Sequence, residues 1–137
     1  MIYRSKAPLR IGLAGGGTDV SPYSDTFGGA ILNATISLYA YAHIEPIAEN
    51  GIILQALDRK EEERHEWMNQ LPINGHLDLL KGVYNRIQQD YGLPMTNFKL
   101  STYVDVPAGS GLGTSSTLVV AILGAFTEML KLPLGDY

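Results

Sequence analysis

The chain has 137 residues, of which 45% are hydrophobic and 18% charged, enough apolar material for one globular domain with a core. Ten Lys and Arg against fourteen Asp and Glu give a net charge of −4, which argues against a nucleic-acid surface but leaves room for a small local anion site. The absence of cysteine excludes disulfides, thiolate zinc sites and cysteine nucleophiles.

The first part of the chain predicts mainly β-structure. Residues 1–13 alternate and carry β-branched and aromatic side chains, which favours one or two short strands interrupted at Pro8. Residues 30–47 are rich in Ile, Thr and Tyr and predict a strand pair bent near Ser37. Between and after these segments we expect a short helical turn at residues 22–26 and a strand at 52–57.

A dense run of charged residues follows at 59–66. Such a run is typical of a solvated helix face or a mobile loop, and we assign no chemistry to it.

The second part of the chain predicts two helices around one strand. Apolar residues recur at spacings of three and four between Gly75 and Gly92, which indicates an amphipathic helix. Residues 97–104 predict a strand with Phe98, Leu100 and Thr102 on one side. Residues 116–131 are apolar on nearly every face, so a helix there should be buried on all sides. The tail at 132–137 is typical of a helix stop that leads into another element, and we expect a larger protein with a further C-terminal part.

No membrane segment is expected. Basic residues interrupt the N-terminus before a signal segment can form, and the longest apolar run, 118–126, is far shorter than the roughly 20 residues that a bilayer requires. The sequence therefore predicts a soluble, cytoplasmic protein without nucleic-acid or membrane partners.

A glycine-rich loop between the last predicted strand and helix is the stronger motif. Glycines at alternate positions let the backbone curl around a ligand, and the helix start offers free N–H groups to phosphate. The alternative is a glycine turn with an ordinary Ser or Thr helix cap. A Walker A loop is excluded because no lysine follows the last glycine, and the glycine spacing does not fit a dinucleotide loop. The candidate residues are Pro107, Gly109, Ser110, Gly111, Leu112, Gly113, Thr114, Ser115 and Ser116.

A second cluster lies near the N-terminus. A strand delivers Arg10 and then breaks at three glycines, of which Gly16 and Gly17 precede Thr18 and Asp19. An arginine, an accessible backbone and a carboxylate are suitable groups for binding a polyol beside a phosphoryl group. The alternatives are a surface ion pair for the arginine and a turn or cap role for the aspartate.

Together the two loops resemble the GHMP kinase family, which includes galactokinase, homoserine kinase and mevalonate kinase. The N-terminal cluster at residues 15–19 is most similar to sugar kinases of the D-glycero-D-manno-heptose 7-phosphate type, with fucokinases next. The resemblance implies an α/β fold of the ribosomal protein S5 domain 2-like type, a mixed and mostly antiparallel sheet backed by helices. It covers residues 1–137 as the N-terminal, ATP-binding domain of such a kinase.

The resemblance also implies ATP and Mg²⁺, with the loop at 107–116 on the phosphates and Ser115 on the metal. Arg10 would lie near the transferring phosphate as a catalytic group, and Gly16, Gly17, Thr18 and Asp19 would bind the sugar. The family's catalytic Asp and its third motif would lie beyond Tyr137, so the chain should pair with a C-terminal half or with itself, and alone it should turn over poorly. A non-catalytic nucleotide-binding fragment and an RNA-binding module are the rival interpretations, the second being disfavoured by the acidic charge.

Overall fold

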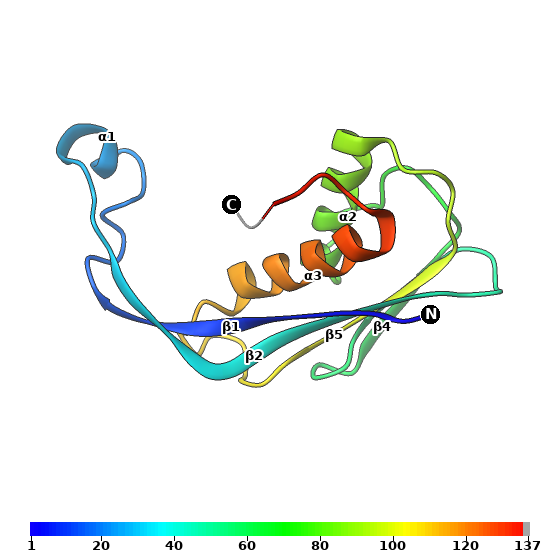
Figure 1. The fold of residues 1–137 in the computed structure, drawn as a ribbon, viewed down its shortest axis with the longest axis horizontal. Coiled ribbons are helices and arrows are strands. Elements are labelled where there is room, and N and C mark those ends of the chain that lie inside the picture. Colours follow the sequence, from blue (N-terminus) through cyan, green and yellow to red (C-terminus); the bar gives the residue numbers. More distant parts are fainter. Residues whose placement is uncertain (136–137) are drawn as a thin grey trace.

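Long alternating segments of the chain pair into one sheet in the computed structural model, which describes residues 1–135. The five strands lie in the order β1-β2-β5-β3-β4, and all neighbours are antiparallel except the parallel pair β3 and β5. Helices α2 and α3 cover one face of the sheet (Figure 1). The expected mixed, mostly antiparallel sheet backed by helices is confirmed. The elements are β1 (Tyr3–Ala14), α1 (Tyr23–Phe27), β2 (Leu32–Pro46), β3 (Ile52–Ala56), β4 (Glu61–His65), α2 (Asp78–Tyr91), β5 (Phe98–Val104) and α3 (Thr114–Leu130).

The core lies between the two long helices and the central strands. Alternate residues of β5, including Phe98, Leu100 and Thr102, are buried on the helix side, as the sequence predicts. The ring of Phe98 packs with Tyr84 of α2 at 5.7 Å and with Phe126 of α3 at 5.6 Å between ring centroids. These aromatic contacts join both helices to the same strand.

The first two strands form one long ribbon, and the interruption expected at Pro8 is a shift in register rather than a break in the strand, because the pairing of β1 with β2 shifts between Pro8 and Arg10. β1 runs through Pro8, which pairs with Tyr39; β1 is an edge strand, where proline is tolerated because one side of the strand has no neighbour to bond. β2 is likewise one strand of 15 residues rather than a pair, with an irregular register beside the expected bend at Ser37. Because β5 pairs with β2 only from Ala40 onward, the two strands continue alone as an arm that carries α1 (Figure 1).

The charged run forms a strand, so its interpretation as a helix face or loop is wrong. Residues Glu61–His65 are β4, paired with β3 at the sheet edge. Glu62 and Arg64 are exposed, whereas Glu63 lies 2.6 Å from the Nζ of Lys81 of α2. An edge strand accepts such charges on its outer side, and α2 supplies a partner on the inner side.

Helix α3 begins at Thr114, two residues earlier than expected, and it is not buried on all sides. Ile122 and Phe126 are buried, but Val120 is 59% exposed. The helix stops at Leu130, as predicted, and the remainder of that expectation, at 136–137, lies outside the described residues. Among the helices that the structure describes, none has the length and apolar character needed to cross a membrane.

Candidate functional site

The glycine-rich loop connects β5 to α3 and has the backbone that the sequence predicts. Gly109, Gly111 and Gly113 have φ values of 79°, 75° and 74°, a region that residues with a Cβ rarely adopt. No atom lies within 4 Å of the place where a Cβ would stand on Gly109 or Gly111. The surface of the loop is therefore open to a ligand at these two positions.

Within residues 1–135, the N–H groups of this loop have no hydrogen-bond acceptors. Gly113 is the N-cap of α3, no side chain caps the helix, and the first helical bond runs from the N–H of Thr117 to the Gly113 carbonyl. In the described part of the chain, no N–H group of residues 108–116 donates a hydrogen bond. The alternative of an ordinary Ser or Thr cap, including a cap at Ser115, is therefore wrong. A row of free donors at the positive end of a helix is a favourable place for an anion.

Arg10 of β1 lies directly against this loop. Its N–H donates to the carbonyl of Leu112 at 3.1 Å, and its Nε, Cγ and Cζ atoms lie 3.1–3.3 Å from where a Cβ would stand on Gly113. Within residues 1–135 its guanidinium takes part in no ion pair, so the surface ion pair that the sequence left open is not formed there. The structure thus brings one residue of the N-terminal cluster to the glycine loop.

The rest of the N-terminal cluster lies further along the arm. The Thr18 hydroxyl is 2.7 Å from the Gly15 carbonyl and 3.1 Å from both the carbonyl and the N–H of Ala30, so it closes the loop onto the segment before β2. Around Gly16 and Gly17 the space is open. The carboxylate of Asp19 accepts no hydrogen bond from the described residues, and α1 has no side-chain cap, which leaves that carboxylate available to a ligand. Among the described residues, no hydrogen bond or ion pair connects Asp19 to Arg10.

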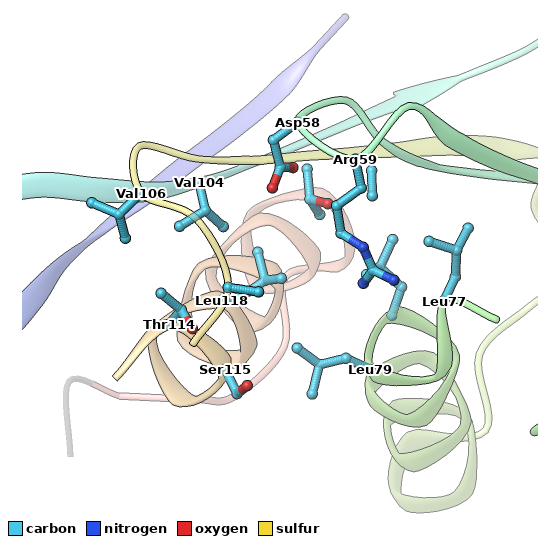
Figure 2. Close-up of a pocket in the computed structure, with 13 residues that line it drawn as sticks. Asp58, Arg59, Leu77, Leu79, Val104, Val106, Thr114, Ser115 and Leu118 are labelled. Carbon is cyan, nitrogen blue, oxygen red and sulfur yellow. The ribbon is translucent and has the colours of Figure 1, made fainter. Parts of the chain in front are cut away.

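A cavity of about 170 Å³ lies beside the glycine loop. Figure 2 shows Thr114 and Ser115 of α3 on one side, Asp58 and Arg59 of the β3–β4 turn on another, and Leu79 of α2 below. Most of the remaining lining is apolar, which is typical of pockets that bind a ring with a few polar groups at its edge. Ser116 does not line this cavity.

Sequence reasoning missed Asp58, Arg59 and the leucines at the start of α2 as site residues. They come from segments that meet only through the sheet order, and the charged run was given no chemistry. No spacing pattern in the sequence predicts these contacts, because β3 and β5 are neighbours in the sheet although β4 and α2 separate them in the sequence.

The second part of the chain matches a known protein family. Residues 78–137 match the family model of the GHMP kinases N terminal domain. The resemblance to the N-terminal part of the GHMP kinases is confirmed. The match begins at α2 and includes the cavity-lining turn of that helix, β5, the glycine loop and α3.

The individual proteins that the chain resembles include sugar kinases. The chain is 48% identical over 134 residues to the D-glycero-alpha-D-manno-heptose 7-phosphate kinase of Campylobacter jejuni, covering 98% of this chain and 40% of that protein. It matches the crystal structure of a D-glycero-D-manno-heptose 1-phosphate kinase from Bacteroides thetaiotaomicron with 60% identity and a TM-score of 0.93, over 100% of this chain and 44% of that one.

A more distant relative is the L-fucokinase/L-fucose-1-P guanylyltransferase of Bacteroides fragilis, 27% identical over 93% of this chain and 16% of that protein. The chain spans less than half the length of each of these relatives.

Proposed function

We propose that this chain is the ATP-binding part of a kinase that transfers the γ-phosphoryl group of ATP to a hydroxyl of a heptose phosphate, D-glycero-D-manno-heptose 7-phosphate first. The observation that carries the proposal is the row of unsatisfied N–H groups at 108–116, open to solvent beside an apolar cavity. Phosphates bind such a row, and the cavity suits the base of the same nucleotide. The similarity to heptose phosphate kinases supports the choice of acceptor.

The residues of the loop are assigned to the phosphates of ATP. Pro107 and the glycines shape the turn, and the first residues of α3 donate N–H groups. The Ser115 hydroxyl, a hard oxygen on the rim of the cavity, fits a Mg²⁺ ion that keeps most of its coordination for phosphate oxygens and water. Bound Mg²⁺ would neutralise charge on the phosphates.

Arg10 is assigned to the charge that develops on the transferring phosphoryl group. Comparable arginines contribute about 10³-fold or more in rate. Gly16, Gly17 and Asp19 are assigned to the sugar, with Asp19 accepting hydrogen bonds from its hydroxyls, while Thr18 holds their loop in place. In the transfer, a sugar oxygen forms a bond to the γ-phosphorus, the bond to the bridging oxygen breaks, and ADP leaves.

A proton acceptor for the sugar hydroxyl belongs, in this proposal, to a C-terminal part that pairs with the chain, since the matched relatives are more than twice as long. A kinase that uses ATP in this way would work in the cytoplasm, as the sequence predicts.

Nucleotide binding is tested by calorimetry with MgATP on the wild-type chain and a Gly111→Val variant. The variant fills the open surface of the loop and should weaken binding by about tenfold or more, which corresponds to about 1.4 kcal/mol. Gly92→Val is the matched control, because Gly92 also has a positive φ and open space but follows the far end of α2. Equal affinity in wild type and Gly111→Val would refute the loop assignment, and salt-sensitive RNA binding would favour the RNA-binding rival.

The phosphoryl acceptor is tested on the longer protein that includes the C-terminal part, with a panel of heptose 7-phosphate, heptose 1-phosphate and L-fucose, measuring ADP release. We expect the 7-phosphate to give the highest kcat/KM. L-Fucose is the second candidate because of the similarity to a fucokinase. A preference for L-fucose would replace the heptose assignment while leaving the kinase assignment intact.

A further inference from the structure

Asn33 of β2 is the one side chain in the described residues that hydrogen-bonds the guanidinium of Arg10. Its Oδ1 accepts a bond from Nη1 at 3.3 Å. Arg10 pairs with Thr35 and Gly12 with Asn33 in the strand register, so Arg10 and Asn33 are diagonal neighbours on the same face of the arm. Gly12 lies beside the amide, since a Cβ there would be in ordinary van der Waals contact with the Asn33 oxygen at 3.7 Å.

The Arg10 side chain also lies against the glycine loop. A Cβ on Gly113 would stand 3.1 Å from Nε and 3.3 Å from Cζ. The backbone N–H of Arg10 is itself tied to the Leu112 carbonyl. The guanidinium thus has two near neighbours, the N-cap of α3 and the amide of Asn33, which limit the directions in which it can point.

The partner of Arg10 is uncharged, in contrast to those of the other well-held arginines. Arg59, Arg64 and Arg86 each bind a carboxylate at 2.7–3.2 Å. A carboxylate would neutralise the guanidinium that it orients. An amide oxygen orients it and leaves the full positive charge for an anion.

We propose that Asn33 is a positioning residue: it directs the Arg10 guanidinium toward the glycine loop while leaving its charge available to the terminal phosphoryl group of the nucleotide. The inference rests on the proposed function. It assigns to Asn33 an orienting effect that requires both its hydrogen-bond acceptor and its neutrality. A charged acceptor of the same size should therefore harm the site more than the loss of the acceptor does.

The test compares dissociation constants of MgATP and MgADP by calorimetry for wild type, Asn33→Ala and Asn33→Asp in the full chain. Asn33→Asp keeps the shape and strengthens the hydrogen bond, but it neutralises Arg10. We expect it to weaken MgATP binding by about tenfold and Asn33→Ala by about threefold, with MgADP changed less than about twofold in both. Asn50→Asp, in the exposed turn before β3, controls for the added negative charge.

The alternative outcomes separate the inference from the function. Wild-type affinity for MgATP in Asn33→Asp, or equal weakening of MgATP and MgADP, would overturn the role of Asn33 while leaving nucleotide binding in place. Absence of MgATP binding by wild type would overturn the proposed function and the inference together. Should Asn33→Asp fail to fold in thermal unfolding, Thr35→Asp places a carboxylate at the direct cross-strand partner of Arg10 and must give the same selective loss.

Discussion

The glycines of the arm differ in whether the surrounding backbone leaves space for a Cβ atom. A Cβ on Gly15 would stand 1.9 Å from the Ala30 carbonyl oxygen, and one on Gly29 would stand 2.1 Å from that of Thr18. These two glycines let the loop after β1 cross closely over the segment before β2. Gly16, by contrast, has open space and no positive φ. The folding role and the proposed ligand role therefore fall on different members of the same glycine cluster.

Replacement of Gly15 by alanine should destabilise the chain, and the same replacement at Gly16 should not. The clash and the φ of 78° at Gly15 predict a loss of about 1–3 kcal/mol in the free energy of unfolding, measured by urea denaturation. Gly16→Ala should change it by less than about 0.5 kcal/mol and should act only on sugar binding. Equal destabilisation by both substitutions would contradict the division of roles.

Part of this detail could be predicted from the sequence. The alternation of Gly109, Gly111 and Gly113 is a local pattern, and the structure gives all three the positive φ that such a pattern favours. The need for Gly15 comes instead from Ala30, a neighbour in space but not in sequence, and Arg10 meets Gly113 only because the sheet is folded. Contacts of this kind leave no signal in residue spacing.

At the scale of elements, an ion pair ties the edge strand β4 to α2. The Lys81 side chain is fully buried, its Nζ lies 2.6 Å from Oε2 of Glu63, and it donates to Oδ1 of Asn74 at 2.8 Å. The same carboxylate oxygen lies 2.9 Å from Nε2 of His65. Because an unpaired buried charge is costly, this contact explains how a charged segment can be a strand. The partner belongs to another element, so the charged run alone could not predict it.

The variant Glu63→Gln should leave Lys81 buried without a counter-charge. We expect the free energy of unfolding to fall by about 3 kcal/mol, and the double variant Glu63→Leu, Lys81→Met to recover most of it. Urea denaturation measures both, with Glu66→Gln as a control for the loss of one exposed carboxylate. A loss below about 0.5 kcal/mol in Glu63→Gln would show that the pair does not hold β4 to α2.

The same carboxylate makes stability depend on pH. Burial acts to raise the pKa of Glu63, but hydrogen bonds from Lys81 and His65 outweigh it and hold that pKa below its usual value. A carboxylate whose pKa is lowered by folding stabilises the protein above its unfolded-state pKa of about 4.3, and this contribution is lost as the pH falls through the folded value. Between pH 7 and pH 3, the free energy of unfolding should therefore decrease less steeply with falling pH in Glu63→Gln than in wild type. Parallel curves would contradict this assignment.

At the scale of the whole molecule, the sheet order determines which surfaces remain uncovered. The helices were predictable because their apolar spacing is local, and the structure confirms α2 and the end of α3. The parallel pairing of β3 with β5, which builds the cavity, depends on long-range contacts that periodicity does not encode. The arm is similarly unpredictable, since it results from β5 being shorter than β2.

The arm carries much of the exposed apolar surface. Val20 is 59% exposed and Phe27 74%, and both line one shallow hollow with Tyr23 of α1. Large exposed apolar patches usually mark an interaction surface. From the sequence expectation of pairing with a C-terminal half or with a second copy of the chain, we predict that a partner packs on this hollow.

We therefore expect the double variant Val20→Ser, Phe27→Ser to lower the concentration-dependent association of the chain in sedimentation velocity. Because neither side chain is buried, the free energy of unfolding should change by less than about 0.5 kcal/mol. Ile73→Ser, an equally exposed apolar position in the loop before α2, is the control and should leave association unchanged. A wild-type chain that stays monomeric at every concentration, or a double variant that unfolds more easily while associating as before, would contradict this role of the arm. Reduced association in the double variant alone would place the self-contact on the arm, beside the residues assigned to the sugar.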